Sequence, residues 1–341
     1  MPEGPAPRPQ HSLGVSSDRL AAIGLMCLAV AFFSALDTAA KVLTTRMGIP
    51  VVEAVWARFI CQFAGLLILV PALGIMPMAD MFKTTRLKFQ LVRSVLMVAT
   101  TAFNFLALQS LRLDQTVTIV FLAPLVVALL AGPFLGEWVG WRRFAAIIVG
   151  FLGILIAVRP GLASVSPAVG YALSAMLAYA LFMLLTRHIS GADPPIVTLF
   201  YSMFVGTIAG APFALAHWVS PPDWTGWVLL ASMGLFGCAG HYLFIHAYRL
   251  APASAITPFL YTQILTMVGF GYLVFGDVPD HWTLLGAAIV VGSGVYLLHR
   301  EHVSARTRAI ELSQQVVGLR SGVKAPSPTL TYKSPKKRND R

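Results

Sequence analysis

Three charged side chains lie inside apolar stretches of this sequence and are the first candidates for chemistry. Asp37 and Lys41 are four residues apart in the stretch 20–42, so on a helix they share a face and can form a charge pair. Arg58 lies well inside the next stretch, 51–73. A charge within a membrane span costs about 2.5–3.5 kcal/mol on insertion scales and by default marks function. The alternatives are structural: Lys41 reaches the membrane surface with Asp37 neutralising it, or Arg58 clamps two helices.

Other polar and aromatic residues could complete a solute site. Asn104 is the deepest polar residue of the stretch 89–110, where a hydrogen bond between helices is the alternative reading. Pro258 opens a helix by removing an amide donor, which leaves a carbonyl group for a solute. Aromatic faces can sandwich a flat ring, with ordinary packing as the alternative for each of them. The candidate substrate contacts are Asp37, Arg58, Asn104, Phe121, Tyr179, Thr257, Tyr261 and Gln263.

One histidine within an apolar stretch, His241, is a candidate proton relay because imidazole titrates near neutral pH. The alternative is a neutral, hydrogen-bonded histidine. Metal binding is not expected, because His241 and His246 are five residues apart and lie on different helix faces. Cys27, Cys61 and Cys238 have no paired spacing and are interpreted as small apolar residues. No catalytic residue and no cofactor is expected.

The composition identifies the setting of these residues as a membrane. Apolar residues make up 57% of the chain and charged residues only 11%, where a water-soluble protein has about a quarter. A bilayer core of roughly 30 Å takes about 20 helical residues. On this measure the sequence predicts ten transmembrane helices, at 20–42, 51–73, 89–110, 115–135, 143–158, 168–187, 196–218, 226–248, 254–275 and 282–299.

The net charge of +11 is explained by loop charges rather than by a nucleic-acid partner. With both termini in the cytoplasm, 20 Lys and Arg residues, Arg93 among them, are assigned to the inner side and 3 to the outer side. The sequence therefore predicts a multi-pass protein of the cell inner membrane with both termini cytoplasmic. Residues 1–19 are expected to be a disordered tail, and 300–341 a basic cytoplasmic tail attracted to anionic membrane lipid.

A repeated pattern divides the spans into two sets of five, 20–160 and 161–299. Gly136 and Gly276 are 276 − 136 = 140 residues apart, and each is followed by an acid and then by a glycine-bearing apolar helix. An odd number of spans in each half inserts the second half upside down. Inverted halves of this kind typically enclose a site near the membrane midplane and alternate access to it.

These motifs resemble the EamA-type transporters of the drug/metabolite transporter superfamily. The matching residues are Phe105-Leu106-Ala107-Leu108, Ile245-His246-Ala247-Tyr248, Ala123-Pro124, Gly136-Glu137 and Trp141-Arg142-Arg143. The resemblance covers residues 20 to about 299 and implies an all-α, ten-helix inner-membrane carrier of small metabolites. The sequence is most similar to members that move riboflavin or S-adenosylmethionine. It departs from the pattern where Asp277 replaces a Glu and where no Pro follows Gln263.

The function predicted is therefore secondary transport of a small polar or aromatic metabolite. The alternative is an exporter of drugs or amino-acid-type metabolites with the same fold. A remote alternative is an integral-membrane enzyme, but the chain lacks the paired carboxylate motifs that such an enzyme uses to hold a metal, and it has no P-loop. A homodimer is left open, because glycines space the predicted fifth and tenth helices for close packing.

Overall fold

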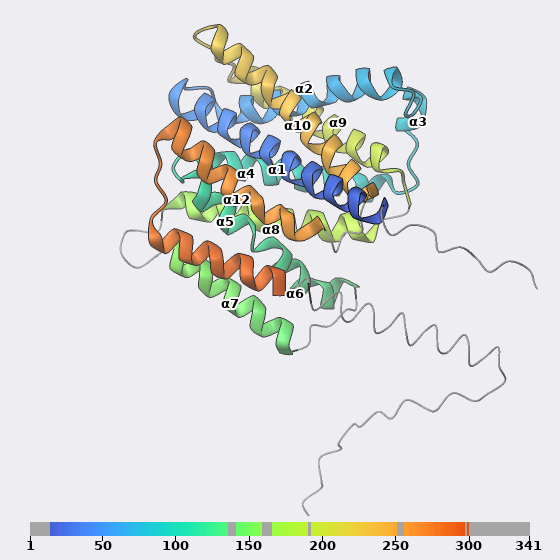
Figure 1. Ribbon diagram of the computed structural model, residues 1–341. Coiled ribbons are helices and arrows are strands. Elements are labelled where there is room, and N and C mark those ends of the chain that lie inside the picture. The colour runs from blue at the N-terminus through green and yellow to red at the C-terminus, as the bar shows by residue number, and fades with distance from the viewer. Residues whose placement is uncertain are drawn as a thin grey trace, which may run out of the picture. The chain divides into compact units, whose positions relative to one another are not determined.

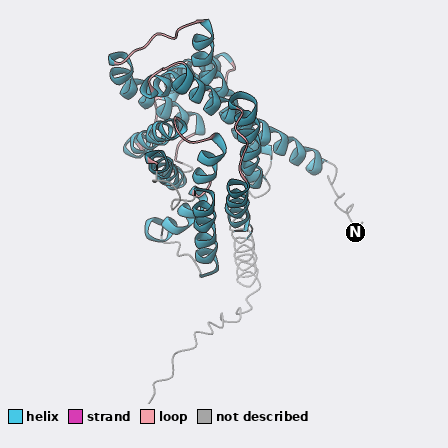
Figure 2. Ribbon diagram, turned by 90° about the vertical axis from the view of Figure 1, so that its left-hand side faces the viewer, coloured by secondary structure: helices cyan, strands magenta, loops and turns pink. Residues whose placement is uncertain are grey.

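Every regular element that the structure describes is a helix (Figures 1 and 2). The computed structural model describes residues 14–135, 141–158, 166–189, 192–250, 256–296 and 299. Six of its helices are long and apolar enough to cross a membrane, and four shorter apolar helices accompany them. The all-α multi-pass architecture is thus confirmed, while the count of ten spans stays a prediction. Residues 14–19 were expected to belong to a disordered tail, but they are helical and begin the first helix. Residues 1–13 and 300–341, and the Gly136-Glu137 motif, lie outside the described residues.

The elements follow one another with short connections. In chain order they are α1 (Gly14–Arg46), α2 (Val51–Ala72), α3 (Met78–Met81), α4 (Leu87–Leu108), α5 (Leu113–Val120), α6 (Ala123–Leu135), α7 (Trp141–Val158), α8 (Pro167–His188), α9 (Pro195–Ala216), α10 (Trp224–Leu250), the 3-10 helix η1 (Thr257–Tyr261), α12 (Thr262–Phe270), the π-helix η2 (Gly271–Phe275) and the helix His281–Tyr296.

Helices from the two parts of the sequence pack against each other. The most extensive contacts join α1 to α10, α4 to α8, and α2 to both α9 and α10 (Figure 1). The largest buried apolar cluster contains Leu43 of α1, Phe59 of α2, Phe105 of α4, Met233 of α10 and Met267 of α12. The centre of the molecule is therefore formed between the two parts, and a cavity there receives side chains from both.

Two predicted spans are interrupted, as their prolines suggest. The span 115–135 is divided at residues 121–122 between α5 and α6, just before Pro124. In the described part of the span 254–275, the 3-10 helix η1 contains Pro258, and the π-helix η2 ends the span. Proline cannot donate the backbone hydrogen bond that would continue an α-helix, which explains both interruptions. Unwound segments beside a cavity are tolerated within a membrane.

Close helix packing at the glycines is found within the chain. A Cβ placed on Gly286 would meet the carbonyl oxygen of Gly153 and the side chain of Ala157. The Gly153 carbonyl oxygen is a backbone atom and cannot move aside as a flexible side chain can. Only glycine at position 286 therefore lets α7 and the helix His281–Tyr296 approach this closely. These glycines thus have a packing role without a second copy of the chain, and the homodimer stays an open prediction.

Candidate functional site

A central cavity of about 190 Å³ collects most of the predicted site residues. Its walls come from α1, α2, α4, α5, α8, α10 and α12. The predicted residues that line it are Asp37, Arg58, Asn104, Phe121, Tyr179, His241 and Gln263. Residues from distant parts of the sequence therefore meet around one space, as binding between two packed halves requires.

The two charged residues of this cavity are oriented by neutral partners and not by each other. Asn104 Nδ2 donates a hydrogen bond to Asp37 Oδ1 at 3.2 Å, and Arg58 Nη1 donates to Thr101 Oγ1 at 3.1 Å. The buried Nε of Arg58 has no partner in the described chain. None of the three salt bridges among the described residues joins Asp37 to Arg58. Each charge thus keeps unused hydrogen-bonding capacity for a solute.

The aromatic candidates separate into two groups. Phe121 and Tyr179 line the cavity. Tyr261 lies behind Phe121, with the two rings packed edge to face and their centroids 5.0 Å apart, and does not line the cavity itself. Thr257 is the first residue of η1, and its side chain lies outside the described part of the structure. A flat solute ring would therefore contact Phe121 and Tyr179, with Tyr261 supporting Phe121.

His241 lines the central cavity from α10. Its ring packs edge-on against Phe33, with centroids 5.0 Å apart. Its buried Nε2 has no hydrogen-bond partner among the described residues. His241 thus borders the cavity with a buried nitrogen that has no partner among those residues, and its role as a proton relay stays a prediction.

Replacing His241 with glutamine is expected to change the pH dependence of transport. Glutamine keeps a polar side chain in the cavity but does not titrate, so any slope between pH 6 and pH 8 that belongs to His241 should flatten. Initial transport rates across this range, compared with wild type in the same vesicles, provide the measurement. An unchanged pH profile would remove the relay from the account.

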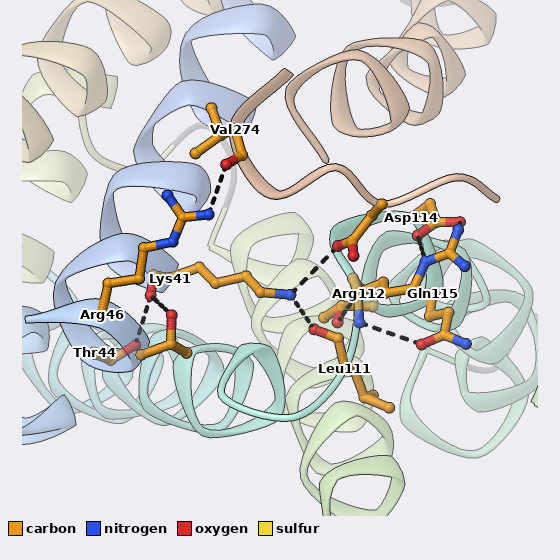
Figure 3. Close-up of polar contacts among 11 residues, drawn as sticks. Lys41, Thr44, Arg46, Leu111, Arg112, Asp114, Gln115 and Val274 are labelled. Carbon is orange, nitrogen blue, oxygen red and sulfur yellow. Dashed lines mark hydrogen bonds and ion pairs between the residues drawn. The ribbon is translucent and has the colours of Figure 1, made fainter. Parts of the chain in front are cut away.

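The expected charge pair of Lys41 with Asp37 is wrong. Lys41 is buried, and its Nζ donates to the carbonyl oxygen of Leu111 at 2.7 Å (Figure 3). The ion pair that it forms among the described residues is with Asp277, whose Oδ2 lies 3.9 Å from this nitrogen. Gly276, at φ +73°, adopts the left-handed conformation that ends η2 just before Asp277. Lys41 therefore joins α1 to the α4–α5 connection and to the turn after η2.

Further contacts near Lys41 join the same segments. Arg46 donates to the carbonyl oxygen of Val274 at 2.7 Å, and Arg112 forms a two-pronged pair with Asp114 at 3.1 and 2.7 Å (Figure 3). Lys41 and Arg46 both lie 4.9 Å from the ring centroid of Phe275. This group of contacts ties α1 to the turn after η2, and we call it the Lys41 end.

The opposite end of α4 has its own polar cluster, which the sequence did not indicate. Asp193, between α8 and α9, accepts hydrogen bonds from the Thr84 hydroxyl at 2.5 Å, from Gln90 Nε2 at 2.8 Å and from Thr85. Burial raises the pKa of Asp193, but these hydrogen bonds outweigh it and hold the pKa below its usual value. Asp193 is thus an ionised residue at what we call the Asp193 end.

Arg93 was assigned from the sequence to the charges on the cytoplasmic side, but it belongs to the interior. It lies in α4 with only 5% of its surface exposed. Its Nε donates to Thr186 Oγ1 at 2.7 Å, and its Nη1 donates to the Thr198 carbonyl oxygen at 3.1 Å and to Ser202 Oγ at 2.8 Å. The signal available in the sequence was its position as the fifth residue of the predicted span 89–110.

Comparison with known proteins agrees with this architecture. The profile of the EamA-like transporter family matches residues 20–159 and 166–299. An S-adenosylmethionine uptake transporter of Rickettsia conorii (strain ATCC VR-613 / Malish 7) is 26% identical over 283 residues, which span 83% of this chain and 94% of that protein. A riboflavin transporter of Vibrio cholerae serotype O1 is 26% identical over 280 residues, or 80% and 91% of the two chains.

A solved crystal structure supports the fold independently. It has a TM-score of 0.56 at 16% sequence identity and covers 83% of this chain and 97% of its own. At that identity it speaks to the fold alone. The family profile matches the chain twice and covers most of it, and both matched segments contribute residues to the lining of the central cavity. The chain therefore belongs to the EamA-like transporter family.

Proposed function

We propose that this chain transports a small zwitterionic metabolite with an aromatic ring, such as S-adenosylmethionine, through the central cavity. The family and the names of the relatives indicate a transporter of small metabolites rather than an enzyme. The observation that carries the choice of solute is the separated charge pair in that cavity, Asp37 and Arg58. A guanidinium can bind a carboxylate and a carboxylate can bind an ammonium, so together they fit an amino-acid head group.

Charge distinguishes the two solutes carried by the relatives. S-adenosylmethionine has a carboxylate, an ammonium, a positively charged sulfonium and an adenine ring. Riboflavin has a larger aromatic ring system but no charge at neutral pH. A cavity that places one acid and one guanidinium in a membrane interior incurs a cost that an uncharged solute does not offset. Phe121 and Tyr179 supply ring contacts for either solute, so the charged residues favour S-adenosylmethionine.

We further propose that ten helices cross the inner membrane with both termini in the cytoplasm. The four shorter apolar helices then act as spans beside the six long ones. The Lys41 end faces the periplasm and the Asp193 end faces the cytoplasm, in keeping with the predicted distribution of loop charges. Solute would reach the cavity from one end at a time, as the two parts of the chain rearrange around it. Uptake is favoured over export because the relative from Rickettsia conorii is named an uptake transporter, while the name of the relative from Vibrio cholerae gives no direction.

Thermal denaturation of the purified protein is the direct test of the solute. A ligand that binds only the folded protein stabilises it by RT ln(1 + [L]/Kd), so a saturating solute should raise Tm. We expect S-adenosylmethionine to raise Tm by several degrees and riboflavin to raise it less. A larger rise in Tm with riboflavin than with S-adenosylmethionine would instead favour riboflavin as the solute. No shift with either, but one with drugs or amino acids, would favour the exporter alternative.

A further inference from the structure

A second cavity, of about 480 Å³, adjoins the central one on the side of the Asp193 end. The two cavities share the lining residues Phe33, Met97, Tyr179 and His241. Along α4, the second cavity is lined by Arg93 and Met97, whereas the central cavity extends from Met97 towards Leu108. A solute that leaves the central cavity towards the Asp193 end therefore passes through the second one.

The second cavity repeats the charge pattern of the first. Among the described residues, the acidic and basic side chains lining the central cavity are Asp37 and Arg58, and those lining the second are Asp193 and Arg93. None of the salt bridges in the described part of the chain joins Arg93 to Asp193. Each cavity thus holds one acid and one guanidinium that do not neutralise each other by contact.

The guanidinium of Arg93 is held in place with one side unused. Hydrogen bonds to α8 and α9 engage its Nε and Nη1, and its carbon lies 4.3 Å from the ring centroid of Phe182. Its Nη2 donates no hydrogen bond to any of the described residues. A planar guanidinium fixed in this way loses little conformational entropy when its remaining donors bind an anionic oxygen.

Asp193 supplies the opposite charge in the lining of the same cavity. Its two oxygens accept hydrogen bonds from Thr84, Thr85 and Gln90, which orient the carboxylate and keep it ionised. These amount to four hydrogen bonds, about as many as an ionised carboxylate accepts, and the longest is donated by the Thr85 hydroxyl at 3.4 Å. An ammonium group would bind Oδ1 by displacing this long contact, because a charged donor forms the stronger hydrogen bond. Tyr179 and Phe182 provide a continuous aromatic wall, with rings 6.1 Å apart and 16° from parallel.

We propose that the second cavity is a vestibule subsite that binds the same zwitterionic solute, with the solute carboxylate at Arg93 and its ammonium at Asp193. The subsite rests on the proposed function, because it uses the charge pattern assigned to that solute. It goes further in giving each chain two binding positions along one path. Charge at the second position keeps the solute's head group paired as it moves out of the central cavity, where desolvation is costly.

Equilibrium binding of radiolabelled S-adenosylmethionine to the full-length purified protein tests this subsite. We expect wild type to bind two molecules per chain, and Arg93→Gln and Asp193→Asn each to bind one. The matched control is Lys83→Gln, which removes one positive charge from the same region at a side chain that is 77% exposed and lines neither cavity. It should still bind two. Tm of each variant without ligand reports whether the fold is intact.

Other outcomes overturn the subsite in distinguishable ways. One molecule per chain in wild type and in Arg93→Gln alike would remove the subsite and leave the proposed function standing. No binding to wild type would reject S-adenosylmethionine as the solute, and the subsite would fall with it. If Arg93→Gln and Asp193→Asn both lost all binding with a lower Tm, these residues would only hold α4 to α8 and α9. If Arg93→Gln did not fold but Asp193→Asn did, the number of molecules bound by Asp193→Asn would decide. One bound molecule per chain would support the subsite, and two would overturn it.

Discussion

Replacing Arg58 with alanine is expected to lower solute transport by at least about 100-fold while the protein still reaches the membrane. In the proposed complex, Arg58 and the solute carboxylate form a buried charge pair; removing one member of such a pair costs about 3–5 kcal/mol, and each 1.4 kcal/mol is tenfold in an equilibrium. Here the loss has two sources. The solute carboxylate loses its guanidinium, and Asp37 is left as a buried charge without Arg58 nearby. Initial transport rates, normalised to the amount of protein in the membrane, provide the measurement.

A matched variant separates the charge from the shape of the group. Arg58→Lys keeps the positive charge but not the planar fork, so it should retain part of the activity lost in Arg58→Ala. Lys83→Ala removes a charge at an exposed position and should transport as wild type does. Wild-type transport by Arg58→Ala would instead assign Arg58 to a contact between helices and remove it from the solute site.

Neutralising Asp277 is expected to slow transport about tenfold, and neutralising Lys41 as well should add little. Lys41 joins α1 to Leu111 and to Asp277, so the Lys41 end opens only when these contacts break. Residues in direct contact show interaction energies of about 0.5–3 kcal/mol, so the effects of Lys41→Gln and Asp277→Asn should not multiply. Transport rates of the two single variants and of the double variant measure this coupling.

A labelling experiment shows whether the Lys41 end acts as a closure. Thr100 lines the central cavity, and a cysteine placed there reports access to it. In a background without Cys27, Cys61 and Cys238, Asp277→Asn should speed the reaction of Thr100→Cys with a membrane-impermeant maleimide added from the periplasmic side. Exchanging the charges of Lys41 and Asp277 should not restore the wild-type rate, because an acid at position 41 would face the Leu111 carbonyl. If the effects of Lys41→Gln and Asp277→Asn on the transport rate multiplied in the double variant, the Lys41 end would not act as a closure.

The sequence identified several residues that the structure brings together at the central cavity, but it missed contacts around that cavity, and solute binding by these residues stays a prediction. Asp37, Arg58 and Asn104 were identifiable because a charged or polar residue inside an apolar helix is costly and must face other protein groups or a cavity. Pro124 and Pro258 marked the interrupted helices for an equally local reason. These features depend on a residue and its near neighbours in the chain, and the structure agrees with them.

What the sequence missed depends on contacts between distant segments. The partner of Lys41 is 277 − 41 = 236 residues away, and helical spacing favoured the local Asp37 instead. Tyr261 was expected to contact the solute, but its ring packs against Phe121 and does not line the cavity, which depends on how η1 and α5 pack. Arg93 was counted with the loop charges because span lengths do not reveal which way a side chain near a helix end points.

The central claim is that Arg58 binds the carboxylate of the solute, and a binding cycle tests it most directly. The affinities of wild type and Arg58→Gln are measured for S-adenosylmethionine and for its decarboxylated analogue, which lacks only that carboxylate. Hydrogen bonds to charged groups contribute about 1.5–3 kcal/mol, so wild type should bind the analogue roughly 10- to 100-fold more weakly. Arg58→Gln should bind the two ligands almost equally. The same penalty in both proteins would contradict the account, because the carboxylate would then be recognised without Arg58.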